Sequence, residues 1–156
     1  MVNFIQQPAE NLVGETKPDP ADWKLVETIV RAADARKASD IVVLHVQPYT
    51  TLTSYMVLVS GNSRPQNQAI AAAIRDDVEL PEVLPQGTAS SGWMVLDYPS
   101  VMVHIMTPKS RLFYNVEGQW KDKGAESMDI SSWLVPNGVP GTIVEEEPVE
   151  EDPFWS

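Results

Sequence analysis

The chain has 156 residues and contains no cysteine, so disulfides, thiolate-bound zinc and cysteine nucleophiles are excluded. It also lacks any segment approaching the roughly 18 uninterrupted apolar residues of a membrane span. The first 20 residues, MVNFIQQPAENLVGETKPDP, show neither a signal peptide nor an arginine-rich transit pattern. We therefore expect one globular domain with no membrane partner.

Residues that hold cofactors are equally scarce. The sequence has no G-x-x-x-x-G-K-[ST] and no G-x-G-x-x-G motif, so nucleotide binding would depend on the turn SGNS at 60–63, which equally suits an ordinary turn and helix cap. The two histidines, His45 and His104, fall on different predicted strands without a carboxylate at ligand spacing. A histidine base also needs a nucleophile to activate, and none can be placed. We predict no metal, no cofactor and no catalytic residue, and a structural or interface role for His104.

Basic residues are too few to form a stripe for nucleic acid. The net charge is −11, but residues 22–121 are almost neutral, with nine Lys or Arg against ten Asp or Glu. Residues 122–156 carry most of the excess, including six acids at 145–152. Because phosphate tracking needs several cationic contacts, we expect limited contact with RNA and favour a basic protein partner. The acidic tail is either solvated or recruits a further protein partner through Phe154 and Trp155.

Hydrophobic periodicity and turn signals predict an alternation of helices and strands. Asp19 and Ser63 are typical helix caps, each with a proline close behind, and Thr107 begins a third helix in the same way. The expected elements in chain order are a helix from 20, strands at 41–46 and 54–60, a helix from 64, a short edge strand at 83–86, strands at 93–97 and 101–106, and a helix from 108. This order predicts an α/β fold, in which one mixed sheet is covered by helices.

The chain divides into three parts by composition. We expect an N-terminal extension at 1–21, the folded domain at 22–121, and an acidic, mostly irregular extension at 122–156, where prolines, glycines and acids argue against a packed element. The apolar residues that would attach this extension to the domain are Trp133, Leu134 and Val135.

The predicted hairpin at 93–106 is apolar on both faces. In its first strand Trp93, Val95 and Asp97 alternate with Met94, Leu96 and Tyr98. An apolar surface on both sides requires either a second covering layer or a binding partner. Large amphipathic rings are typical interface anchors, so Trp93, Asp97 and Tyr98 are the favoured contact residues.

Four stretches occur in the order and spacing of the Iojap family, the ribosomal silencing factors: ASDIVVLHV, TLTSYMVLVSGNS, GWMVLDYPSVMVHIMTP and RLFYNVEGQW. The chain thus resembles this family over about residues 25–121, most specifically in the W-x-x-L-D-Y motif that begins at Trp93 and the V-x-V-H motif that ends at His104. The resemblance implies an α/β domain related in fold to nucleotidyltransferases but without their catalytic machinery. His45 stands where the family usually has Asp, and the loss of an acid that could hold metal further disfavours a transferase activity. Pro99 stands where Gly is common after the Asp-Tyr pair, so a different turn is expected there.

The resemblance also implies a function. Members of the family bind the free large ribosomal subunit through ribosomal protein number fourteen and obstruct joining of the small subunit, and organellar relatives take part in large-subunit assembly. A bacterial cytoplasm is the expected location, with the mitochondrial or plastid matrix as the alternative, and a homodimer of the free protein is left open. A divergent nucleotidyltransferase-like enzyme and a scaffold that recruits a partner through the tail are the alternative functions. The residues expected to contact the ribosomal protein are Trp93, Leu96, Asp97, Tyr98, His104, Lys109, Arg111 and Tyr114.

Overall fold

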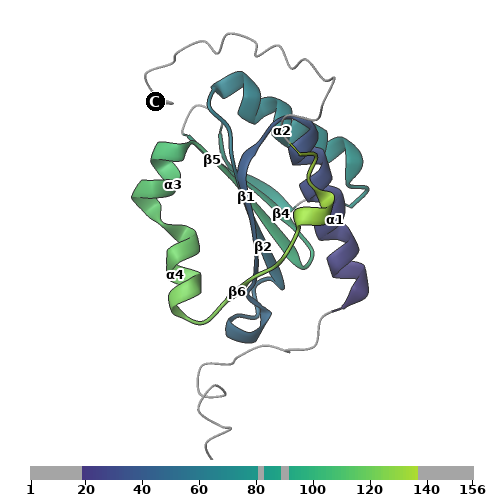
Figure 1. The fold of residues 1–156 in the computed structure, drawn as a ribbon, viewed down its shortest axis with the longest axis vertical. Helices are drawn as coiled ribbons and strands as arrows, with labels where there is room; N and C mark the ends of the chain where they lie inside the picture. Colours follow the sequence, from purple (N-terminus) through teal and green to yellow (C-terminus); the bar gives the residue numbers. More distant parts are fainter. Residues whose placement is uncertain (1–18, 81–82, 89–91, 137–156) are drawn as a thin grey trace, which may run out of the picture.

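The computed structural model describes residues 19–80, 83–88 and 92–136. In chain order these form α1 (Pro20–Ala35), β1 (Ser39–His45), η3 (Gln47–Tyr49), β2 (Tyr55–Ser60), α2 (Arg64–Asp77), β3 (Val83–Thr88), β4 (Trp93–Tyr98), β5 (Val101–Met106), α3 (Pro108–Tyr114), α4 (Val116–Asp122), β6 (Glu126–Ser127) and η5 (Ser131–Trp133). The strands form one sheet in the order β3-β4-β5-β2-β1-β6. Figure 1 shows α1 and α2 on one side of this sheet and α3 and α4 on the other.

The sheet is mixed, as the sequence predicts. Strands β2 and β5 lie parallel, and every other pair in the described sheet is antiparallel. The two parallel strands lead into helices on opposite sides, because β2 is followed by α2 and β5 by α3. The carboxyl ends of β2 and β5 therefore lie between α2 and α3, and the opposite end of the sheet carries the loop between η3 and β2.

The predicted helix caps are confirmed. The Asp19 Oδ1 atom accepts the N–H of the second residue after it at 2.9 Å, and the hydroxyl oxygens of Ser63 and Thr107 accept the N–H three residues on, at 3.1 and 3.0 Å. In each helix a proline follows within the first turn. Proline is favoured there because its missing N–H would have no partner in the helix.

The prediction of one third helix is wrong in one respect, because two short helices replace it. Asn115 adopts φ 47° and ψ 47°, a left-handed conformation that ends α3 and precedes α4. Its N–H donates to the carbonyl of Arg111 at 3.0 Å, which closes the last turn of α3. Asparagine tolerates this conformation better than most residues do, so the chain can change direction here.

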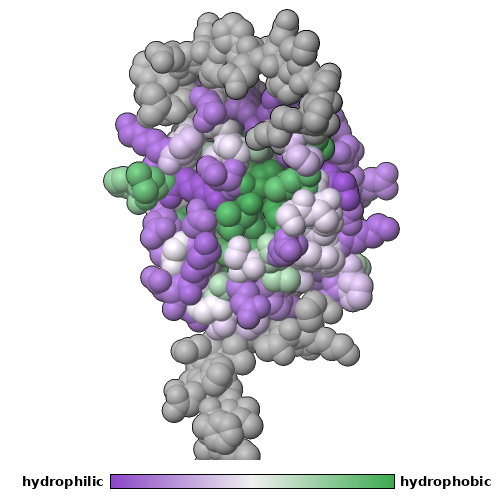
Figure 2. Space-filling view, viewed as in Figure 1, coloured by the Kyte–Doolittle hydropathy of each residue, from purple (hydrophilic) through white to green (hydrophobic). Residues whose placement is uncertain are grey.

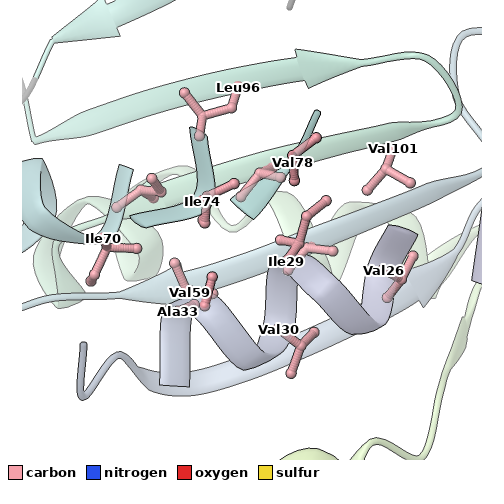
Figure 3. Packing of buried hydrophobic residues seen from close by; sticks show 14 of the residues in the cluster. Val26, Ile29, Val30, Ala33, Val59, Ile70, Ile74, Val78, Leu96 and Val101 are labelled. Atoms are coloured by element: carbon pink, nitrogen blue, oxygen red, sulfur yellow. The ribbon is translucent and has the colours of Figure 1, made fainter. Parts of the chain in front are cut away.

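The main hydrophobic core lies between the sheet and the layer of α1 and α2. Figure 3 shows Ile29 and Val26 of α1 and Ile74 of α2 directed at strand residues that include Leu96 and Val101. These side chains are almost completely buried. Burial of a large aliphatic side chain contributes about 1.5–3 kcal/mol, so this layer supplies much of the folding free energy.

A second, smaller cluster lies on the other face of the sheet. Its buried members come from β1 and the residue after it, from β2 and from the segment before β6, and Val116 and Trp120 of α4 pack against them. The buried side chains of this cluster are Leu44, Val46, Met56, Leu58 and Ala125. Because α4 covers the β1 and β2 half of this face, the β4 and β5 half depends on α3 for cover.

The stretch after residue 121 packs on the domain for part of its length. Strand β6 pairs with the end of β1, and the Trp133 ring of η5 lies 4.8 Å from the Trp23 ring of α1. This result contradicts the expectation that no packed element follows residue 121, and it confirms that Trp133 and Leu134 attach to the core. Val135 does not, because its side chain is 70% exposed.

Residues 137–156, with Phe154 and Trp155, lie outside the described residues, so their expected role stays a prediction. The domain boundaries at 21 and 121 stay predictions as well. Among the residues that the structure describes, no helix is long and apolar enough to cross a membrane.

Candidate protein-binding surface

Three aromatic rings meet on the outer face of β4 and β5. The Trp93 indole N–H of β4 donates to the Nδ1 atom of His104 of β5 at 2.9 Å. The Tyr114 ring at the end of α3 lies 4.8 Å from the Trp93 ring, at an angle of 41°. We call Trp93, His104 and Tyr114 the aromatic cluster. It joins α3 to the part of the sheet that α4 leaves uncovered.

His104 is a neutral acceptor in this cluster. Its side chain is 5% exposed, and burial lowers its pKa from 6.5 to about 4. Since Nδ1 accepts the indole N–H, the single ring proton of the neutral form belongs on Nε2. Within the described part of the chain, that Nε2 atom is buried and has no hydrogen-bond partner. His104 therefore orients Trp93.

Arg111 fixes α3 from inside the protein. Its side chain is only 9% exposed, its Nε atom lies 2.7 Å from Glu117 Oε1, and its Nη1 donates to Ser60 Oγ at 3.0 Å. One guanidinium thus connects the end of β2, α3 and the first turn of α4. Arg111 was expected to contact a partner, but its buried donors already bind within the domain. We leave it out of the contact surface for that reason.

The strand alternation places the other expected contact residues on two different faces. Leu96 and Tyr98 point into the core beneath α1 and α2, where they are buried. Their side chains are therefore not available to a partner, which corrects the expectation made for them. Trp93 and Asp97 alternate with them on the outer face and are half-buried, and Lys109 is exposed at the start of α3.

Two residues that the sequence analysis did not select are the most exposed large apolar side chains of α3. Leu112 is 84% exposed and Phe113 is 79% exposed. The Phe113 ring lies 5.0 Å from the Tyr114 ring, so it extends the aromatic cluster outward. Figure 2 shows hydrophobic side chains projecting from the molecule at the position of α3. The available signal was four large residues in succession, RLFY, on a seven-residue helix that can bury only one side.

The described residues offer little for metal or phosphate binding. They contain no group of three His, Cys, Asp or Glu that could hold a metal ion. At the turn after β2, the Asn62 N–H donates to Gln66 Oε1 at 2.8 Å and Ser63 caps α2. His45 lies on β1 with its Nε2 atom 3.3 Å from Gln47 Oε1, and β2 separates this strand from β5, which carries His104.

An α/β domain with exposed apolar side chains beside half-buried aromatic rings has the features of a protein-binding module. The family model "Ribosomal silencing factor during starvation" matches residues 18–151. The chain belongs to this ribosomal silencing factor family, known also by the name Iojap, which confirms the resemblance found in the sequence.

Characterised relatives come from bacteria and from organelles. The chain is 30% identical over 118 residues to "Protein Iojap, chloroplastic" of Arabidopsis thaliana, over 74% of this chain and 50% of that protein. It is 28% identical to "Ribosomal silencing factor RsfS" of Bacillus subtilis, over 67% of this chain and 92% of that one. A mouse relative, 30% identical over 73% of this chain and 55% of its own length, is named "Mitochondrial assembly of ribosomal large subunit protein 1". The chain thus spans about half the length of the plant and mouse relatives.

Solved structures confirm the fold. A protein from Chromobacterium violaceum superposes with a TM-score of 0.61 and 26% identity, over 64% of this chain and 85% of that one. A protein from Bacillus halodurans gives a TM-score of 0.60 at 24% identity, over 69% of this chain and 99% of that one. The single α/β domain with a mixed sheet is therefore shared with these proteins.

Proposed function

We propose that this protein binds the free large ribosomal subunit, through ribosomal protein number fourteen, and blocks joining of the small subunit by occupying space. Membership of the ribosomal silencing factor family supports a role on the ribosome. The single observation that carries the contact surface is the exposure of Leu112 and Phe113 beside the aromatic cluster. Action by occlusion requires binding alone, so no catalytic group is needed.

The proposed contact surface has an apolar centre and a charged rim. Phe113 and Leu112 would be the anchors, because large side chains that lose most of their exposed area on binding dominate interface energies. Trp93 and Tyr114 support Phe113 from below. The rim is formed by Asp97 on β4 and Lys109 on α3. His104 takes part indirectly, since its Nδ1 atom holds the Trp93 ring in place.

A protein is favoured over bare RNA as the main partner of this surface. Lys109 is the one exposed cation of α3, and a single cation gives little of the counterion release that drives phosphate binding. The apolar anchors instead fit an apolar patch or strand of a basic ribosomal protein, whose charge complements this acidic chain. RNA contact is expected to be limited.

The nucleotidyltransferase-like alternative is less well supported. The SGNS turn would have to present its donors to a phosphate, yet Asn62 and Ser63 both bind groups of α2. Isothermal calorimetry with a nucleoside triphosphate and magnesium tests it directly. Tight binding would favour the enzyme, whereas the occlusion proposal expects none.

Co-sedimentation with ribosomes tests the proposed function. The protein should migrate with free large subunits in a sucrose gradient and be absent from joined ribosomes. Phe113→Ala combined with Leu112→Ala should reduce binding to the subunit at least tenfold while leaving the circular dichroism spectrum unchanged. Leu52→Ala is the matched control, because Leu52 is equally exposed but lies in the loop at the opposite end of the sheet.

Two results would contradict the proposal. Migration of the intact protein only at the top of the gradient would show that it does not bind the subunit. Equal loss of binding in the Leu52 variant would show that the interface is not at α3. A scaffold role of residues 122–156 predicts something different, namely that neutralising the tail acids leaves subunit binding intact and removes a further partner. The proposed location of the protein is a bacterial cytoplasm, with the mitochondrial or plastid matrix as the alternative.

A further inference from the structure

Gly92 lies against the first turn of α3, directly before Trp93 of β4. Its φ is 81°, a left-handed backbone conformation that favours glycine. A Cβ atom at this position would lie 2.8 Å from Ser110 Oγ and 3.5 Å from Thr107 Oγ1. The residue is buried, so the backbone before β4 and the first turn of α3 approach each other closely. Glycine is therefore favoured here for two reasons, the backbone conformation and the lack of space.

Hydrogen bonds join Gly92 to the start of α3. The N–H of Thr107 donates to the carbonyl of Gly92 at 3.0 Å, and Thr107 Oγ1 accepts the N–H of Ser110 at 3.0 Å. Thr107 is completely buried, so both bonds are shielded from water. The same threonine thus connects the residue before β4 with the first turn of α3.

Helix α3 depends on the rest of the domain for its position. It has only seven residues, which is too short for a helix to be stable in isolation. Its anchors, Leu112 and Phe113, are mostly exposed and bury little area that could hold the helix in place. The position of α3 is therefore set by its first turn, next to Gly92, and by the buried Arg111.

The aromatic contacts of the surface depend on the separation between β4 and α3. The Trp93 ring follows Gly92 and lies 4.8 Å from the Tyr114 ring, which in turn lies 5.0 Å from the Phe113 ring. Aromatic pairs are favourable over a narrow range of distances. A displacement of the first turn of α3 away from β4 would therefore separate Tyr114 and Phe113 from the ring that supports them.

We propose that Gly92 is the positioning residue of the contact surface. It lets α3 approach β4 closely enough for the anchors and the Trp93 ring to form one preformed apolar surface. Because α3 is already ordered in the free protein, it does not have to fold when the partner binds, and the entropic cost of binding is lower. The effect on binding rests on the proposed function, whereas the ordering of α3 is a property of the free protein.

A comparison of two glycine variants tests the effect on binding. Gly92→Ala should lower affinity for the large subunit about tenfold, because alanine is strained at this φ and its Cβ displaces the first turn of α3. Gly124→Ala is the matched control. Gly124 also has a positive φ, 110°, and a Cβ there would lie 2.6 Å from the Tyr49 hydroxyl oxygen. It follows α4 at the end that points away from α3 (Figure 1), so its variant should keep the affinity of the wild type.

Hydrogen exchange in the free protein tests the positioning itself. The N–H groups of Arg111 and Asn115 donate to the carbonyls of Thr107 and Arg111 at 2.9 and 3.0 Å, so they report on the two ends of α3. In Gly92→Ala both amides should exchange about tenfold faster relative to the amides of α1. In Gly124→Ala this ratio should stay at the value of the wild type, because general destabilisation affects both helices.

A second substitution tests the close approach. Ser110→Ala in the Gly92→Ala background removes the oxygen nearest to the new Cβ, so it should recover part of the lost affinity. Unchanged exchange of the α3 amides in Gly92→Ala would overturn the proposal, as would equal effects of Gly124→Ala or no recovery in the double variant. If the wild type does not bind the subunit, the proposed function fails, and the exchange ratio still decides whether Gly92 positions α3.

Discussion

The indole N–H of Trp93 and the Nδ1 atom of His104 are joined by a 2.9 Å hydrogen bond between neighbouring strands. The bond requires a neutral imidazole, because a protonated His104 has donors on both ring nitrogens and cannot accept. Burial keeps the pKa of His104 at about 4, so the acceptor is available at physiological pH. The position of Trp93 beneath the surface of α3 thus depends on a buried histidine that stays uncharged.

The first prediction concerns the stability of the protein against pH. The pKa of His104 is lowered on folding, so the unfolded chain takes up a proton that the folded chain does not. Above pH 6.5 the neutral His104 costs the folded protein no stability. As pH falls from 6.5 towards 4, protonation of His104 in the unfolded chain lowers the free energy of unfolding, by about 3 kcal/mol in total. Urea unfolding of the wild type at pH 7 and pH 5 should show about 2 kcal/mol of this loss, because the rest follows only as the pH falls to 4.

His104→Asn is the matched control for the pH prediction. The amide oxygen of asparagine can still accept the indole N–H, but the side chain does not titrate. The difference in unfolding free energy between wild type and variant should therefore shrink as pH falls from 7 to 5. A difference that stays constant across this range would show that His104 does not titrate with unfolding.

The second prediction concerns the buried guanidinium. Arg111→Ala should destabilise the protein by about 3–5 kcal/mol, because it leaves the partly buried carboxylate of Glu117 with only the more distant Lys121 Nζ at 4.0 Å, and Ser60 Oγ without its donor. Lys109→Ala, two positions earlier and exposed, should change the stability by less than about 0.5 kcal/mol. Thermal or urea unfolding measures both. Equal effects of the two variants would show that Arg111 is not the structural residue described above.

Much of the fold could be predicted from the sequence because its signals are local. Helix caps followed by proline, and β-branched runs bounded by turns, act through the nearest few residues. The face of β4 that meets solvent could not be predicted in this way. Both faces of the strand are apolar, so only the position of α1 and α2 decides that Leu96 and Tyr98 are buried. The exposure of Phe113 was missed for a similar reason, since the left-handed turn at Asn115 redirects a pattern that reads as one continuous helix.

The third prediction separates the two faces of β4. Leu96→Ala should cost about 2–5 kcal/mol of stability, because it creates a cavity in the main core. Trp93→Phe keeps an aromatic ring next to Tyr114 but removes the indole N–H, so His104 loses its donor and subunit binding should weaken more than stability does. Chemical unfolding and the sedimentation assay together distinguish these effects. If Trp93→Phe binds the subunit as well as wild type, the hydrogen bond does not position the surface.

The fourth prediction concerns the turn that sets the direction of α3. Asn115 has a positive φ of 47°, where a residue with a Cβ atom is strained by about 1 kcal/mol and glycine is not. Asn115→Ala should therefore destabilise the domain by about 1 kcal/mol, and Asn115→Gly should leave its stability within a few tenths of that of the wild type, because the loss of strain offsets the greater entropy of glycine in the unfolded chain. Since α3 carries Phe113 next to this turn, the alanine variant should also lower affinity for the large subunit more than the glycine variant does. A glycine variant that is the less stable of the two would show that the asparagine side chain, and not the backbone conformation, holds the break between α3 and α4.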